Sequence, residues 1–156
     1  HPQTIFLGQN VCYDGNVMYQ HLEGVPLSKR IELPVMEEVQ LGMCIGLSLV
    51  GYIPISIYPR MDFLVLAMNQ LVNHLDKLEE MSGGEWKPKV IIRTKVGAKT
   101  PLNAGPQHTQ DHTEAFRTML RHVMVVKVQD ANRAVSVYEN ALRLPGSLLI
   151  VEAFEE

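Results

Sequence analysis

The sequence has little of what marks several classes of protein. Its two cysteines, Cys12 and Cys44, are too few for a disulfide framework and do not form a Cys-x-x-Cys site. Sparse cysteine is typical of a reducing compartment, so we expect a cytoplasmic protein. The net charge is −3 and no block of basic residues occurs, so we expect no nucleic-acid partner.

Long apolar runs are missing as well. No stretch approaches the roughly 18 residues that a membrane-spanning helix needs, so we expect no signal peptide and no membrane partner. The composition, 46% hydrophobic and 20% charged, is that of a globular domain. A chain of this size can bury about 70% of the surface of the unfolded state in one core.

Extended and helical patterns alternate along the chain. Strand-like segments cover 4–8, 30–33, 52–58, 89–96, 123–128 and 147–153. Helical patterns cover 14–22, 36–50, 63–80, 113–122 and 130–142. Pro54 predicts that its strand starts there or lies at an edge. The alternation predicts an α/β domain of three layers, with a mostly parallel sheet and helices on both faces.

Such a sheet binds ligands at the carboxyl ends of its strands. The loops predicted there are 8–14, 33–38, 58–63 and 97–112. The last loop is longer than most strand-to-helix connections, and loops of this length are often functional. We therefore expect the site to draw on Glu37, Phe63 and His108.

Five stretches occur in an order and spacing that resemble one family. They are "FLGQNVCYDG", "RIELPVMEEVQLGMCIGLSLVGYIPI", "MDF", "MNQLVNHLDKLEEMSGG" and "GPQHTQ". The ordered set resembles the pyrimidine-binding, transketolase-like domain of thiamine-diphosphate enzymes. The form most similar is that of the β subunits of pyruvate and branched-chain 2-oxoacid dehydrogenases. The resemblance runs from Phe6 to about Glu152 and implies the thiamine-diphosphate-binding fold.

The resemblance implies a catalytic and cofactor-binding role for Glu37. The matching glutamate of the family meets a ring nitrogen of the cofactor's aminopyrimidine. A protonated carboxyl there donates to the ring and favours the tautomer that takes a proton from the thiazolium carbon. From the residues alone, Glu37 is an acid in the first turn of a helix, stabilising by about 0.3–1 kcal/mol. For Glu38 we expect only this second role, that of an acid in the first turn of a helix.

Two further cofactor contacts and a second catalytic residue follow from the resemblance. Phe63 matches the aromatic residue that stacks on the aminopyrimidine, and Tyr58 is a second aromatic residue nearby. Without the resemblance, Phe63 is a core residue at a helix start. His108 matches the active-site histidine, which assists substrate binding or proton movement. A histidine titrates near neutral pH, as such a role requires.

Substrate contacts are less constrained by the sequence. Arg60 stands in "IYPR", where the family has an aromatic residue. A guanidinium there can bind a carboxylate or phosphate, contact a partner subunit or face water. Gln107 and His112 are further candidates for the same pocket. His108 and His112 form an H-x-x-x-H pair that lacks the glutamate of H-E-x-x-H, so we expect no metal ligands in this chain.

Two glycines suggest close packing on the helix predicted over 36–50. Gly42 and Gly46 lie on one helix face, and each costs about 1 kcal/mol relative to alanine. Packing within the domain and self-association, as between the family's β subunits, both remain open. A further departure from the family is that its acidic pair after the first strand is replaced by Gln9 and Asn10.

The family binds its cofactor between two domains, and the sequence matches one of them. The diphosphate-binding domain carries Gly-Asp-Gly followed later by Asn, whereas "YDGN" lacks the first glycine. The family's C-terminal domain has no counterpart either, so we expect a single pyrimidine-binding domain over 1–156. Thiamine diphosphate and Mg²⁺ would then be bound with a separate diphosphate-binding chain, which holds most of the metal contacts.

The predicted function is that of one subunit, or a fragment, of a thiamine-diphosphate-dependent enzyme. The candidates are a 2-oxoacid dehydrogenase or decarboxylase and a transketolase-like enzyme, in each case inactive without the partner chain. The alternative is a non-catalytic interaction or regulatory relative that keeps the fold.

Overall fold

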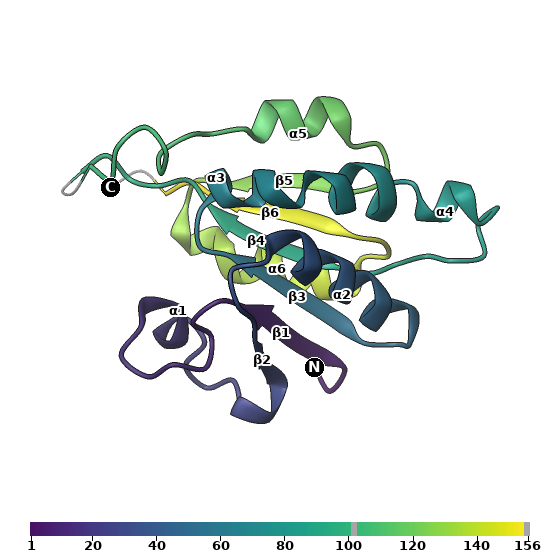
Figure 1. Cartoon of the computed structure of the whole chain (residues 1–156), viewed down its shortest axis with the longest axis horizontal. Helices are drawn as coiled ribbons and strands as arrows, with labels where there is room; N and C mark the ends of the chain where they lie inside the picture. The colour runs from purple at the N-terminus through teal and green to yellow at the C-terminus, as the bar shows by residue number, and fades with distance from the viewer. Residues whose placement is uncertain (101–102, 155–156) are drawn as a thin grey trace.

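A computed structural model describes residues 1–100 and 103–154 of the chain (Figure 1). Within this part, six strands form one sheet in the order β2-β1-β3-β4-β6-β5, and all neighbours are parallel. The strands are β1 Thr4–Gly8, β2 Arg30–Glu32, β3 Ile53–Tyr58, β4 Ile91–Lys95, β5 Met124–Val128 and β6 Leu148–Glu152. The predicted fold class is confirmed. Residues 101–102 of the predicted long loop and 155–156 of the predicted domain lie outside the description.

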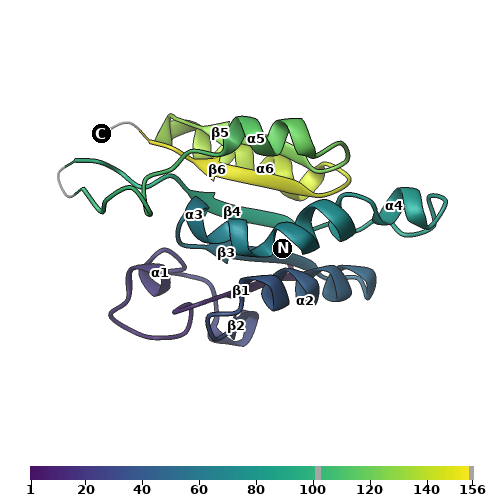
Figure 2. The same cartoon turned by 45° about the horizontal axis from the view of Figure 1, so that its top comes forward.

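Helices cover both faces of the sheet and make three layers. The α-helices are α1 Val17–Gln20, α2 Glu37–Leu49, α3 Met61–Leu64, α4 Leu78–Met81, α5 Thr113–Met119 and α6 Ala134–Arg143. Short 3₁₀ segments occur at η1 Leu27–Lys29, η2 Val65–Ala67 and η4 Ala131–Arg133, and a π-helical segment at η3 Asn69–Leu75. Figures 1 and 2 show α2 and the stretch from α3 to α4 on one face of the sheet, and α6 on the other.

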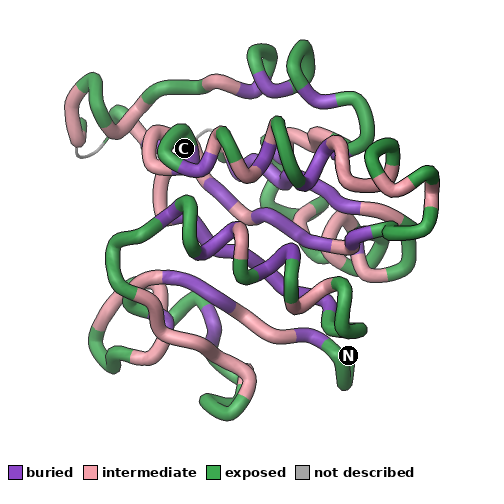
Figure 3. Tube along the Cα trace, turned by 45° about the vertical axis from the view of Figure 1, so that its right-hand side comes forward, coloured by how far each residue is buried: buried purple, intermediate pink, exposed green. Residues whose placement is uncertain are grey.

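The alternation of side chains along each strand fills two cores, one on each face. Ile55 and Ile57 of β3 pack with Ala141 of α6 in one core. Leu149 of β6 packs in the other, together with Leu41 of α2. In Figure 3 the buried segments accordingly follow the strands and the inner sides of the helices. No helix in the described ranges has the length and apolar character to cross a bilayer.

Two sequence predictions are corrected by the fold. The predicted continuous helix over 63–80 is broken into α3, η2, η3 and α4. In the widened π turn, the backbone N–H of Asp76 donates to the carbonyl oxygen of Leu71 at 3.0 Å, which keeps Leu71 and Leu75 in the core. Pro54 is the second residue of β3, close to the strand start that was one predicted alternative, but β3 is central, so the edge alternative is wrong. Pro54 is tolerated because pairing with β4 begins one residue later, at Ile55.

The buried aspartate after the π turn fastens this helical stretch to the next layer. Asp76 is 0% exposed, and its Oδ1 accepts hydrogen bonds from the backbone N–H groups of Arg121, His122 and Val123 at 2.8–2.9 Å. Its Oδ2 accepts from Lys77 Nζ at 2.6 Å. Burial acts to raise the pKa of Asp76, but these donors outweigh it and hold the pKa below its usual 3.8.

We predict that Asp76→Ala lowers the free energy of unfolding by about 3 kcal/mol at pH 7, because three backbone N–H groups, that of Val123 buried, lose their acceptor. Asp130→Ala is the control: this exposed aspartate caps η4 and should cost about 1 kcal/mol or less. Urea unfolding followed by circular dichroism measures both. A loss for Asp76→Ala no larger than the control would contradict the role of this carboxylate.

The same measurement has a predicted pH dependence. Because the folded-state pKa of Asp76 is depressed, its stabilising contribution is complete above the unfolded value of 3.8 and is lost as pH falls through the folded value. The difference in unfolding free energy between wild type and Asp76→Ala should therefore narrow below pH 3.8.

Candidate functional site

The loops predicted to carry the site lie together at the carboxyl edge of the sheet, because all six described strands run in the same direction. In Figure 1 this edge is on the left, where the N-terminal end of α2, helix α3 and the connection after β4 meet. Glu37 is the first residue of α2 and is 6% exposed. Its Oε1 accepts a hydrogen bond from Gln9 Nε2 at 3.1 Å. Oε2 has no donor within residues 1–100 and 103–154.

Two buried neutral side chains hold the start of α2 against the sheet. Tyr58, the last residue of β3, donates from its hydroxyl to the backbone oxygen of Glu37 at 3.1 Å. Burial raises the pKa of Tyr58, so its O–H remains a donor at neutral pH. Gln40 Nε2 donates to Ser56 Oγ and to the carbonyl oxygen of Ile57, both at 3.0 Å. Tyr58 thus contacts the main chain of Glu37 and holds the first turn of α2 against β3.

Phe63 and His108 come together although 45 positions separate them in the chain. Their rings meet edge to face, with centroids 5.5 Å apart and planes at 89°. Both side chains are partly exposed, as contacts to a ligand require. Gly97 permits this arrangement: a β-carbon there would lie 1.9 Å from the carbonyl oxygen of His108. Sequence reasoning missed Gly97, because its requirement is a contact across a loop and not a positive φ.

Arg60 lies in a basic part of the same edge, and its Nη1 and the His108 carbonyl oxygen both approach Gly97. It lines a cavity of about 420 Å³ with Lys95, His21, Asn10 and Asn16. Among the described residues, neither Arg60 nor Lys95 forms an ion pair. Burial and the neighbouring Arg93 lower the pKa of His21, which keeps this imidazole neutral at pH 7. The two charged groups of the cavity are therefore both cations.

A carboxylate near this cavity, that of Glu152, is paired with Arg93, so its charge does not compensate Arg60 and Lys95. Glu152 accepts from Arg93 Nε at 2.9 Å and Nη2 at 3.0 Å, and from the hydroxyl of Tyr138 at 2.7 Å. Burial acts to raise the pKa of Glu152, but the Arg93 hydrogen bonds hold it below its usual range. The carboxylate is thus ionised and compensated inside the protein.

The other two predicted substrate residues lie elsewhere. Gln107 is exposed. His112 lines a different cavity of about 390 Å³, between α3–η2 and α5, together with Asp62 and Phe116. The structure brings Phe63 and His108 into contact, but it does not place Arg60 and His112 on one cavity.

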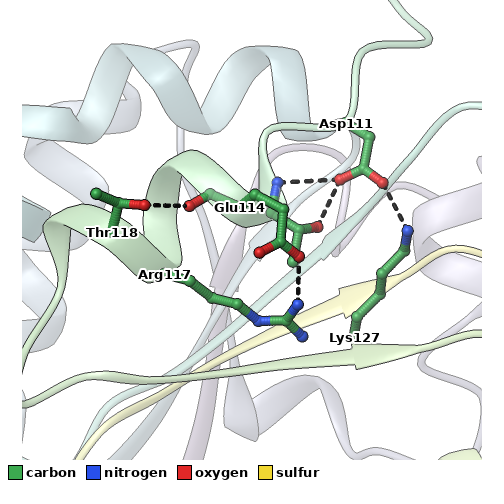
Figure 4. Close-up of polar contacts among 6 residues, drawn as sticks. Asp111, Glu114, Arg117, Thr118 and Lys127 are labelled. Carbon is green, nitrogen blue, oxygen red and sulfur yellow. Dashed lines mark hydrogen bonds and ion pairs between the residues drawn. The ribbon is translucent and has the colours of Figure 1, made fainter.

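Hydrogen bonds and ion pairs hold the segment after His108 against β5 (Figure 4). Asp111 Oδ1 accepts from the backbone N–H of Thr113 at 3.0 Å, and its Oδ2 pairs with Lys127 Nζ of β5 at 2.7 Å. Burial opposes ionisation, but the hydrogen bond from Lys127 and those from Thr113 lower the pKa of Asp111 to about 2. Arg117 and Glu114 form a further ion pair on the outside of α5.

The loop after β1 is organised by two charged residues of β2 that sequence reasoning did not select. Arg30 donates to the carbonyl oxygens of Val11 at 2.9 Å and Leu22 at 2.6 Å. Glu32 accepts from the backbone N–H groups of Asn10 at 2.6 Å and Cys12 at 2.9 Å. The only hint in the sequence is that both charges lie within a short strand. In the described ranges, no three His, Cys, Asp or Glu residues are grouped as metal ligands would be.

Comparison with known proteins gives relatives in sequence and in fold. No protein-family model matches the chain. The pyruvate dehydrogenase E1 component subunit beta of Gracilaria tenuistipitata var. liui is 30% identical over 113 residues, covering 72% of this chain and 34% of that protein. The chloroplastic subunit beta-3 of Arabidopsis thaliana is 28% identical over 155 residues, covering 97% and 37%. The chain thus spans about a third of the length of these relatives.

The fold is that of transketolase. A solved structure described as a split gene transketolase, an inactive beta4 tetramer, superposes with a TM-score of 0.75 at 17% identity. The match covers 98% of this chain and 46% of that one. Sequence and fold together identify the chain as a transketolase-like pyrimidine-binding domain related to the β subunits of pyruvate dehydrogenase.

Proposed function

We propose that this chain is the pyrimidine-binding subunit, or part of it, of a thiamine-diphosphate-dependent enzyme that acts on a 2-oxoacid. The observation that carries the proposal is the carboxyl of Glu37, buried at the carboxyl edge of the sheet with one oxygen free of donors within the described ranges. Oε2 is not among the buried side-chain atoms that lack a partner, so it is open to the outside and can accept from a ligand that donates an N–H.

These residues fit the aminopyrimidine ring of the cofactor. Glu37 Oε2 would bind a ring nitrogen, while Gln9 holds Oε1 and Tyr58 holds the main chain. Phe63 would stack on the ring. When bound, thiamine diphosphate supplies the carbanion chemistry. This chain's part is to orient the ring, to hold a proton at the Glu37 carboxyl and, through His108, to bind substrate or move a proton beside it.

The cavity beside Arg60 gives the chain a place for an anionic substrate. Arg60 and Lys95 both line it without an ion-pair partner in the described part of the chain. A guanidinium and an ammonium there would bind the carboxylate of a 2-oxoacid by charge-assisted hydrogen bonds. Gln107 and His112 stay candidates for contacts to a larger substrate or to its acceptor, from positions outside this cavity.

The remaining parts of the active site would come from a second chain. A separate diphosphate-binding chain would hold the diphosphate and Mg²⁺, and the present chain would be inactive alone. The likeness to a split gene transketolase, whose solved form is described as inactive, supports this division. A cytoplasmic location remains a prediction from the sparse cysteines; the Arabidopsis relative is chloroplastic by name.

The outer face of α2 is the surface we propose for self-association. A β-carbon at Gly46 would meet nothing within 4 Å, and one at Gly42 would make only ordinary contact with Gln70. Packing within the domain therefore does not require either glycine. Val39 is 45% exposed and Met43 is 38% exposed on the same helix, which adds apolar surface. Small residues beside apolar ones permit close approach of a second helix.

The partner is tested first. Tagged chain is purified from its native lysate with thiamine diphosphate and Mg²⁺ present, and the proteins that co-purify are identified by mass spectrometry. We expect a stoichiometric chain that carries the Gly-Asp-Gly and Asn motif. Recovery of this chain without such a partner would overturn the split-enzyme proposal and favour a non-catalytic relative.

In the reconstituted complex, Glu37→Gln should reduce the rate of 2-oxoacid turnover at least about 100-fold, because an amide cannot exchange the required proton. Glu38→Gln is the matched control, since the neighbouring Glu38 is exposed and accepts only from Asn69 and Gln70. The complex should assemble with either variant, as measured by size-exclusion chromatography. Near-normal turnover by Glu37→Gln would rule out the role assigned to this residue.

Gly46→Trp should block self-association, because the indole prevents close approach at the outer face of α2. Sedimentation velocity should show a smaller species than wild type. Val135→Trp on α6 is the control, because position 135 is 69% exposed on the opposite layer. An unchanged sedimentation coefficient for Gly46→Trp, or a wild-type chain that is monomeric both alone and with its partner, would contradict an interface here.

A further inference from the structure

His108 depends on its surroundings for its position. No hydrogen bond to its imidazole occurs within residues 1–100 and 103–154; the ring meets Phe63 edge to face instead. Its backbone N–H donates to the carbonyl oxygen of Gly105 at 3.1 Å, inside the same loop. The placement of the ring against Phe63 must therefore come from contacts that fix the loop itself.

One such contact joins the two segments that carry these rings. Asp62 Oδ1 accepts from Gln110 twice, from the backbone N–H at 3.3 Å and from Nε2 at 2.8 Å. Asp62 directly precedes Phe63, and Gln110 follows His108 by two residues. The contact therefore links the backbone beside one ring to the backbone beside the other. We call it the Asp62–Gln110 latch.

The geometry shows that Asp62 is directed at the loop and not at another part of the molecule. Its second oxygen, Oδ2, is buried and has no partner among the described residues. The other oxygen, Oδ1, accepts two hydrogen bonds, and both come from Gln110. A carboxylate that accepts from the main chain and the side chain of one residue fixes that residue's position and its rotamer together.

The other anchors of this segment lie farther along the chain. The backbone N–H of His112 donates to Met61 Sδ at 3.1 Å, and Asp111 pairs with Lys127. These contacts fix the start of α5. On the other side, the absence of a side chain at Gly97 lets the His108 carbonyl approach. Among the anchors at 110–113, the latch lies nearest in sequence to His108, and it ends on the side chain of Asp62, the residue next to Phe63.

We propose that Asp62, acting through Gln110, is the positioning residue that sets where the His108 imidazole lies relative to Phe63. The catalytic consequence rests on the function proposed above, in which both rings face cofactor and substrate. The positional claim does not, because the two rings meet in this chain alone. A misplacement of about 1 Å in a catalytic group can cost up to 100-fold in rate.

The position of the His108 ring is measured by NMR, with all variants compared at the same fixed pH. The ring-current shift of the His108 ring protons is defined as the difference between wild type and Phe63→Leu. Asp62→Ala should remove more than half of this shift. Asp62→Asn should keep most of it, because an amide oxygen accepts from the same donors.

Asp130→Ala is the matched control, since Asp130 Oδ1 also accepts from the backbone N–H and side-chain amide of one residue, Asn132, at 2.9 and 3.0 Å. It should leave the His108 shift unchanged. If Asp62→Ala does not fold, Gln110→Ala removes the shorter latch bond and should reduce the shift to a lesser degree. A full ring-current shift in a folded Asp62→Ala or Gln110→Ala variant would overturn the proposal.

Turnover in the reconstituted complex separates this inference from the proposed function. Asp62→Ala should lower kcat about tenfold, with KM changed less, and Asp62→Asn should restore it to within about twofold of wild type. Normal kcat for Asp62→Ala in an active complex would refute the catalytic consequence of the latch, while the ring-current shift decides the positional claim. If the ring-current shifts behave as expected but the wild-type complex has no activity, the latch stands and the proposed function fails.

Discussion

The buried amide of Gln40 joins helix α2 to the sheet, and the rest of the site depends on this contact. Its Nε2 donates across the junction of two strands, to the carbonyl oxygen of Leu7 at 3.4 Å on β1 and to Ile57 on β3. Glu37 lies three residues earlier, on the same side of the helix. Fixing Gln40 therefore fixes the Glu37 carboxyl at the carboxyl edge, next to Gln9 at the end of β1.

A neutral surrounding for Glu37 is the main chemical consequence of this arrangement. Where the family has an acidic pair after the first strand, Gln9 donates to Glu37 through an amide. An amide at position 9 adds no charge beside Glu37 and donates to its Oε1. Tyr58 and Gln40 are also uncharged, so the acids at this end of α2 are Glu37 and the exposed Glu38. The replacement of the family's first acid by Gln9 thus corresponds to a hydrogen bond from Gln9 to Glu37 in the structure.

Sequence periodicity predicted the parallel sheet and the four site loops, because burial patterns of strands and helices are local signals. Periodicity did not predict features that depend on contacts between residues far apart in the sequence. The break of the helix at Asp76 follows from N–H groups at 121–123, and Gly97 is needed only because His108 returns to it. The loops at the carboxyl edge pointed to Glu37, Phe63 and His108, but their roles came from resemblance to a family, since an acid, an aromatic residue and a histidine in separate loops carry no common local pattern.

Each departure from the family makes the carboxyl edge of the sheet less negative or more positive. Gln9 and Asn10 remove two negative charges, and Arg60 adds a positive one where the family has an aromatic ring. Lys95 faces the same cavity as Arg60, and the carboxylate beneath it, Glu152, is already paired with Arg93. A chain with a net charge of −3 therefore has a local concentration of positive charge in this one cavity, at an edge that elsewhere carries Glu37 and Glu38. Such local contrast attracts anions and repels cations at the mouth of the site. The cavity beside Arg60 and Lys95 therefore favours a ligand that carries negative charge over a neutral one.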